Sequence, residues 1–138
     1  MSSGADGHMQ IGQVAARTEL SIRTVRHYDD VGLVTPSARS AGGFRLYTDD
    51  DVARLLVIRR MKPLGFSLAE MKELLDSLET LDNPDSTAAA RRRAAKLLGG
   101  LQDKVAESAA RLRRQLAYAD ELADLLAARS AQPAATGR

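Results

Sequence analysis

The residues best equipped for chemistry lie between Ser21 and Asp30. Arg23 and Arg26 each carry a guanidinium, which can clamp a phosphate or pair with a guanine edge through two parallel hydrogen bonds. Thr24, between them, can touch either a phosphate or a base edge. These side chains are suited to holding a polyanion and not to making or breaking bonds.

Basic residues outnumber acidic ones from Ser21 to Lys62, with eight Arg and Lys against five Asp. Three of those acids are consecutive, at 49–51, where they favour the positive end of a helix. The remaining basic side chains are free to form a patch. The whole chain has a net charge of only +2, from 20 basic and 18 acidic residues. The distribution of charge is therefore more informative than its sum.

The sequence has few residue patterns that could support catalysis. The chain has no Cys, which excludes disulfides, thiolate metal sites, iron–sulfur clusters and Cys nucleophiles. Its two histidines, His8 and His27, have no partner at metal-ligand spacing. Gly42 and Gly43 fit a hairpin turn and lack the context of a phosphate loop. We predict no enzyme, no catalytic residue, no metal and no cofactor.

The composition predicts a packed, helix-rich chain with room for one compact domain and one extended element. Of the 138 residues, 44% are apolar and 28% charged, with only 4% aromatic and no Trp. The core must therefore consist mainly of Leu, Ala, Val and Ile. No apolar run approaches the roughly 18 residues of a membrane span. The first ten residues lack a secretory pattern, so we expect a cytoplasmic protein.

Two short helices are expected near the N-terminus, after a disordered lead over residues 1–9. Apolar residues from Ile11 onwards mark the first helix. Ser21 is a good N-cap for the second, which Gly32 can end in the left-handed conformation. Two short helices separated by about four residues describe a helix-turn-helix.

A small hairpin and two further helices should follow. Extended pieces at 33–36 and 44–47 flank a turn rich in Ser, Ala and Gly. Thr48 and Asp51 form a capping-box pattern at the start of a third helix, which Pro63 and Gly65 close. Ser67 begins a second capping box, and apolar spacing extends a fourth helix to about Glu79.

The C-terminal part has a heptad pattern after a linker at 80–87. We predict a coiled-coil dimerisation helix over 88–128 and a disordered tail over 129–138. Gly99 and Gly100 would each cost a helix about 1 kcal/mol, so a break is possible there. The predicted seam consists of Leu98, Leu101, Val105, Leu112, Leu116, Ala119, Leu122 and Leu126.

Several ordered motifs together resemble MerR-type transcription regulators over about residues 10–79. These motifs are Ile11-Gly12-Gln13-Val14-Ala15, Ser21 to Asp29, Gly32-Leu33-Val34-Thr35-Pro36, Gly43-Phe44-Arg45-Leu46-Tyr47 and Leu64-Gly65-Phe66-Ser67-Leu68. The later heptads agree with that family's dimerisation helix. The fold class implied is mainly α: a winged helix-turn-helix with a small β-hairpin wing, followed by a long coiled-coil helix.

The resemblance also implies a function. Such proteins bind promoter DNA as homodimers through an antiparallel coiled coil, and distort it to activate or repress transcription by RNA polymerase. Their effectors are often metals held by Cys, or small molecules held by an appended domain; this sequence contains neither feature. The resemblance implies that His27, Tyr28, Arg45 and Lys62 contact the DNA backbone.

Other interpretations of the same residues remain open. Tyr47 either packs the wing or touches DNA, Tyr28 could be a core residue, and His27 a plain surface residue. Five leucines either line a small pocket or seal two elements together: Leu74, Leu75, Leu78, Leu97 and Leu101. Arg91–Arg93 is either a solvated face or a DNA patch. Two other functions compete: an architectural or phage-type DNA-bending protein without an effector, and a coiled-coil interaction protein that has lost DNA binding.

Overall fold

A computed structural model describes residues 7–132 and divides the chain into two units, Met1–Leu98 and Gly99–Arg138, each described by itself below. The helices expected from capping and periodicity are present. The elements are β1 (Met9–Gln10), α1 (Ile11–Thr18), α2 (Ile22–Asp30), β2 (Ala38–Arg39), β3 (Arg45–Tyr47), α3 (Asp49–Met61), the 3-10 turn η1 (Lys62–Leu64), α4 (Leu68–Asp82) and α5 (Ala88–Ser130).

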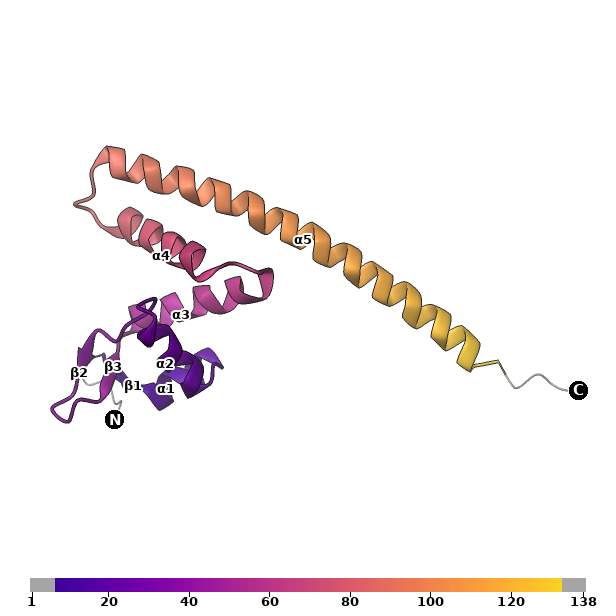
Figure 1. Cartoon of the computed structure of the whole chain (residues 1–138), viewed down its shortest axis with the longest axis horizontal. Helices are drawn as coiled ribbons and strands as arrows, with labels where there is room; N and C mark the ends of the chain where they lie inside the picture. Colours follow the sequence, from indigo (N-terminus) through magenta and orange to yellow (C-terminus); the bar gives the residue numbers. More distant parts are fainter. Residues whose placement is uncertain (1–6, 133–138) are drawn as a thin grey trace, which may run out of the picture. The chain divides into compact units, whose positions relative to one another are not determined.

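The wing is a three-stranded antiparallel sheet in the order β1-β3-β2 (Figure 1). Met9 pairs with Tyr47 and Ala38 with Leu46. The prediction of a disordered lead through residue 9 is wrong at its end, because Met9 is a buried strand residue. Residues 1–6 of that predicted lead lie outside the described residues.

The first strand of the hairpin lies later than predicted, at 38–39 and not at 33–36. The backbone N–H groups of Leu33 and Val34 both donate to the carbonyl of Tyr28, at 2.9 and 3.2 Å. Ser37 donates to the carboxylate of Asp51 from its backbone N (3.2 Å) and its hydroxyl (2.7 Å). These contacts use the donors of the segment to close α2 and to meet α3, so they are not available to a strand ladder.

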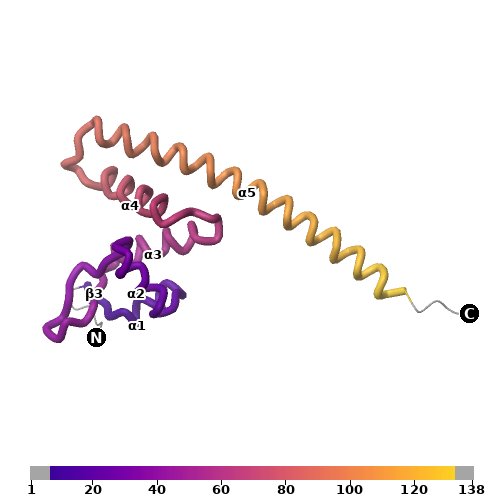
Figure 2. The backbone as a smooth tube through the Cα atoms, in the orientation of Figure 1, coloured from indigo at the N-terminus to yellow at the C-terminus, as the bar shows by residue number. Residues whose placement is uncertain are grey.

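In the helix-turn-helix, α1 packs on both α2 and α3 around a small aliphatic core, and Figure 2 traces the backbone of these helices. Val14, Val25, Leu55 and Ile58 are fully buried in it. The turn after α1 places Glu19 in the left-handed conformation, with φ 59°. Neighbouring helices thus meet through apolar side chains, with little polar contact in the core.

Local capping residues lie where they were predicted at most of the helix ends. Ser21 accepts the backbone N–H of Thr24, and Gly32 has φ 74°. Thr48 and Ser67 each begin a reciprocal capping box, at α3 and α4 respectively. α4 runs three residues beyond the predicted end at Glu79.

The helix α5 is uninterrupted from Ala88 to Ser130, so the possible break at Gly99-Gly100 is not present. In the second unit most of its large apolar side chains are exposed, with Val105, Leu112 and Leu122 at 39–53% of full exposure, while Leu101 is half-buried. The predicted tail begins inside the helix, at 129–130, and its last six residues lie outside the described residues. None of the helices in the described part is long and apolar enough to cross a membrane.

Candidate nucleic-acid interface

A groove of 460 Å³ collects five of the eight side chains predicted to contact DNA. They come from α2 and from the turn that follows α3. The groove is lined by Leu20, Arg23, Thr24, His27, Tyr28, Arg59, Lys62 and Pro63. Three of these side chains are Arg or Lys and none is acidic, so the groove favours an anionic partner.

The exposed face of α2 carries Arg23, Arg26 and His27, all open to solvent. Arg23 and Arg26 are three residues apart and therefore project from neighbouring positions of one helix face. Thr24 is more constrained, because its hydroxyl accepts a 2.8 Å hydrogen bond from the Ser21 hydroxyl. The N-cap of α2 thus also orients a predicted contact residue.

His27 and Tyr28 form a tilted ring pair, with centroids 5.7 Å apart and planes at 48°. Tyr28 is only 4% exposed, yet it lines the groove. Tyr28 is therefore a core residue that also forms part of the groove wall. Burial raises the pKa of the Tyr28 phenol, so at neutral pH it keeps its proton and can donate a hydrogen bond.

Arg59 is a groove residue that the sequence analysis did not identify. One of its Nη atoms donates to the backbone carbonyl of Thr18 at 2.7 Å and meets the Glu19 carboxylate at 3.2 Å. It therefore joins α3 to the turn that precedes α2. The exposed Lys62, at the end of α3, lies on the same groove with its ammonium available to a ligand.

Arg45 in β3 is held against α2. Its Nε donates to Asp29 at 2.6 Å, and its Nη2 lies 3.9 Å from Asp30. Arg39 approaches the same Asp29 carboxylate at 3.6 Å. The hydrogen bond that Arg45 donates to Asp29 raises the pKa of Arg45 further above its usual range. This junction of wing and α2 was not foreseen from the sequence.

Tyr47 is fully buried beneath the wing, and its hydroxyl has no hydrogen-bond partner. This placement contradicts the alternative in which Tyr47 touches DNA and agrees with the one in which it packs the wing. Burial, and then the nearby Asp29, raise the pKa of the Tyr47 phenol. Tyr47 therefore packs in the core under the wing and does not form part of the surface.

Across residues 7–132, no three His, Cys, Asp or Glu side chains are placed to hold a metal ion. The predicted seam residues of α5 lie apart from the groove in sequence, and all but Leu98 belong to the second unit. The groove itself is built entirely within residues 20–63.

Two protein-family models match the chain. The model described as "MerR HTH family regulatory protein" matches residues 9–78, which include the helix-turn-helix and the wing. The model described as "MerR, DNA binding" matches residues 52–132. Together the matches extend over nearly all of the described residues.

Curated relatives match mainly the first unit. The HTH-type transcriptional activator mta of Bacillus subtilis is 49% identical over 67 residues, which are 49% of this chain and 26% of the relative. The HTH-type transcriptional regulator CueR of Vibrio cholerae is 44% identical over 85 residues, covering 61% of this chain and 58% of the relative. The chain thus spans between about a quarter and somewhat more than half of these relatives' length.

Solved structures agree with the fold. HiNmlR, described as a MerR family regulator lacking the sensor domain and bound to promoter DNA, has a TM-score of 0.68 at 25% identity. The alignment covers 90% of this chain and 94% of HiNmlR. A regulator from Listeria monocytogenes, at 20% identity and a TM-score of 0.66, covers 90% of this chain and 87% of its own and supports the fold alone.

Proposed function

Because this chain belongs to the MerR family of helix-turn-helix regulatory proteins, we propose that it binds promoter DNA as a homodimer and distorts that DNA to control transcription. Distortion of the duplex can bring promoter elements into register for RNA polymerase or hold them out of register. RNA polymerase at the same promoter is therefore the proposed protein partner.

The observation that carries this proposal is the basic groove between α2 and the end of α3. It joins side chains that can read base edges with side chains suited to phosphates, as a recognition helix and its flanking contacts require. We assign Arg23, Thr24 and Arg26 to the major groove, and His27, Tyr28 and Lys62 to the DNA backbone.

Arg45 is proposed as a backbone contact from the wing. Its Nε is engaged by Asp29 and its Nη2 lies 3.9 Å from Asp30, so Nη1 is the nitrogen most open to a phosphate. An Arg can serve both partners because it carries five N–H donors. The contact with Asp29 would then fix the direction in which the wing presents them.

The homodimer is proposed from the exposed seam of α5. Four leucines of the second unit, Leu112, Leu116, Leu122 and Leu126, are 45–62% exposed, and Val105 and Ala119 continue their heptad. A two-fold pair of such helices gives each copy the same surface, as an isologous interface requires. An antiparallel pair would place two recognition helices at half-sites separated by a multiple of about 34 Å.

The similarity to HiNmlR supports the same assignment, since that regulator was solved on promoter DNA and aligns with most of this chain. The first test is a footprint on the DNA upstream of the chain's own coding region. It is followed by titration of the protected duplex and of a scrambled duplex.

We expect a footprint with inverted-repeat symmetry and an affinity that falls by orders of magnitude from low to moderate salt, because bound phosphates release counterions. Equal affinity for the scrambled duplex at physiological salt would contradict a promoter-specific regulator and favour an architectural DNA-bending protein.

A further inference from the structure

The wing carries two arginines directly opposite each other. Arg39 in β2 pairs in register with Arg45 in β3, and residues that face each other across an antiparallel pair share one face of the sheet. Like charges in such a position repel each other. Two guanidinium groups on one small hairpin therefore require a negative partner.

A single carboxylate provides that partner. Asp29 Oδ2 accepts a hydrogen bond from Arg45 Nε at 2.6 Å and lies 3.6 Å from Arg39 Nη2. The other terminal nitrogen of Arg39, Nη1, donates to the backbone carbonyl of Gly43 at 3.3 Å. One oxygen atom of Asp29 thus meets both arginines and holds them towards α2.

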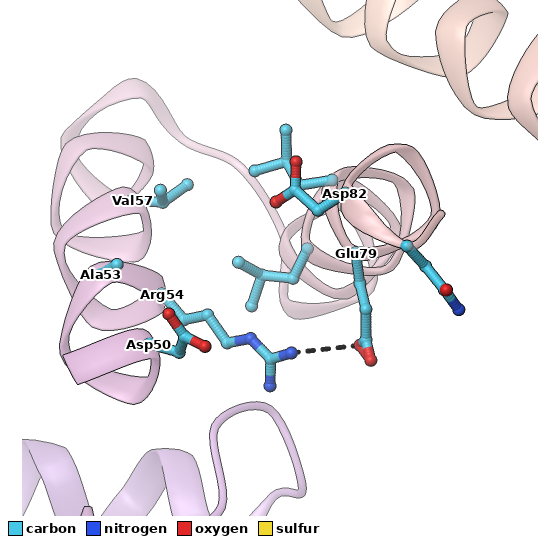
Figure 3. Close-up of a pocket in the computed structure, with 9 residues that line it drawn as sticks. Asp50, Ala53, Arg54, Val57, Glu79 and Asp82 are labelled. Atoms are coloured by element: carbon cyan, nitrogen blue, oxygen red, sulfur yellow. Dashed lines mark hydrogen bonds and ion pairs between the residues drawn. The ribbon is translucent and has the colours of Figure 1, made fainter. Parts of the chain in front are cut away.

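Asp29 is more shielded from solvent than other carboxylates in ion pairs. Its side chain is 11% exposed, whereas five other ion-paired carboxylates in residues 7–132 are 60–83% exposed. Figure 3 shows one of these five, Glu79, which meets Arg54 at 3.1 Å. Exposed pairs contribute little because water and salt screen them, and shielded pairs are screened much less. Another anion must therefore compete with Asp29 for the two arginines.

This carboxylate lies beside the surface proposed to meet DNA. Asp29 follows Arg26 by three residues on α2, so the two side chains are neighbours on the helix surface. Asp29 is also in the last turn of α2, where the negative end of the helix disfavours a carboxylate. A nearby DNA backbone would disfavour it as well, so the wing arginines are the groups that stabilise its charge.

We propose that Asp29 competes with DNA phosphates for the guanidinium groups of Arg39 and Arg45, and so limits the affinity of the wing for DNA of any sequence. This inference rests on the proposed binding of DNA. Phosphate contacts carry no sequence information. The limit therefore acts on sequence-independent binding, which each further phosphate contact strengthens and makes more dependent on salt.

The test measures binding of the full chain to a scrambled duplex at several salt concentrations, by fluorescence anisotropy. Asp29→Asn removes the charge and keeps an oxygen that can accept the hydrogen bond from Arg45 Nε. We expect binding about tenfold tighter and a salt slope about one unit steeper, because one more phosphate contact forms. A purely structural role of Asp29 predicts the opposite, since a displaced wing would weaken binding.

Asp30→Asn is the matched control. It removes the same charge from the next residue, whose carboxylate is 70% exposed and lies 3.9 Å from Arg45 Nη2. We expect a gain of less than about threefold and an unchanged slope, because an exposed pair competes only weakly with phosphate. Equal gains for the two variants would show that only the net charge matters, which would overturn the proposal.

Arg39 tests the mechanism of the gain. Arg39→Gln should weaken binding more in the Asp29→Asn background than in the parent chain, because the guanidinium is more available to a phosphate once Asp29 is neutral. The difference between the two effects measures the coupling of Arg39 to Asp29. Equal effects in the two backgrounds would contradict the proposal.

Thermal unfolding checks that each variant is folded. Asp29→Ser is a second neutral variant, for use if Asp29→Asn is unstable; unfolding of both would show that the carboxylate is a structural requirement and would refute the competition.

Elution from heparin–agarose repeats the comparison on a polyanion other than DNA, and Asp29→Asn should elute at higher salt than Asp30→Asn. Elution of the two variants at the same salt would argue against the proposal. Absence of operator preference in the parent chain would contradict the proposed promoter binding and would leave these comparisons unchanged.

Discussion

Asp29 in the last turn of α2 accepts a 2.6 Å hydrogen bond from Arg45 Nε in β3, and this contact joins α2 to the wing. The Asp29 side chain is only 11% exposed and that of Arg45 only 26%. The wing is therefore held to the helix by a largely shielded, charge-assisted hydrogen bond.

This contact makes the role of Arg45 testable. Arg45→Ala should weaken binding to all DNA sequences alike and reduce the salt slope by about one unit, since one phosphate contact is lost. Arg45→Lys should keep the slope while losing the Nε bond to Asp29. A slope that stays unchanged in Arg45→Ala would show that the guanidinium only positions the wing.

Arg26 should contribute to sequence recognition. Arg26→Ala should cost about 1–3 kcal/mol of operator binding if it reads a base or clamps a phosphate from α2. Arg92→Ala, which removes an exposed positive charge from α5, is the control. Fluorescence anisotropy on both variants checks this, and equal losses would mean that the DNA face is misplaced.

Tyr47 should limit stability in alkaline solution. Its pKa is raised above the usual 10.0 by burial, so its contribution is complete below about pH 10 and is lost as the pH rises through the raised value. The unfolded chain releases the proton first, and the free energy of unfolding falls.

Tyr47→Phe should flatten that fall and, at pH 7, raise the free energy of unfolding by about 1 kcal/mol, because a buried hydroxyl without a partner is removed. Urea unfolding at pH 7 and above pH 10 measures both effects. Tyr118→Phe, at a 65% exposed position, is the control; a loss of stability at pH 7 in Tyr47→Phe would show that the hydroxyl has a partner.

Asp51 should be a structural requirement for the first unit. Its carboxylate is 2% exposed and accepts hydrogen bonds from Thr48 and Ser37. Asp51→Ala leaves these donors unpaired and should cost about 3 kcal/mol of unfolding free energy. Asp50→Ala, one residue earlier but exposed, should cost much less; similar thermal shifts for both would contradict this account.

The seam of α5 should control assembly. Leu112→Glu with Leu122→Glu would bury unpaired carboxylates in a dimer interface, which is strongly unfavourable. We expect a monomer in sedimentation, with residues 10–79 still folded and cooperative operator binding lost. Ala110→Glu with Ala117→Glu adds the same charge outside the predicted seam and should remain dimeric. A dimer that persists in the leucine variant would place assembly on another surface.

Local signals predicted most of the helix boundaries. Thr48 with Asp51, and Ser67 with Glu70, are pairs only three positions apart, and the structure contains both capping boxes. The position of Gly32 was predictable for the same reason, since a left-handed residue ends a helix whatever lies elsewhere.

Contacts between distant residues were not predictable in this way. β1 is only two residues long and exists because it pairs with Leu46 and Tyr47, more than 35 positions later. The role of Arg59 depends on a backbone carbonyl 41 positions earlier, and no side-chain pattern marks a carbonyl. The Arg45–Asp29 contact likewise depends on how the wing folds back onto α2.

Gly99 and Gly100 lie inside an uninterrupted helix, although each lowers helix stability by about 1 kcal/mol relative to Ala. Opening of the backbone should therefore be easiest around this pair. In native-state hydrogen exchange, the amides near residues 99–104 should lose protection before those on either side. Replacing both glycines by Ala should slow hydrogen exchange of the amides near residues 99–104. Their exchange rates should then match those of the amides on either side in α5.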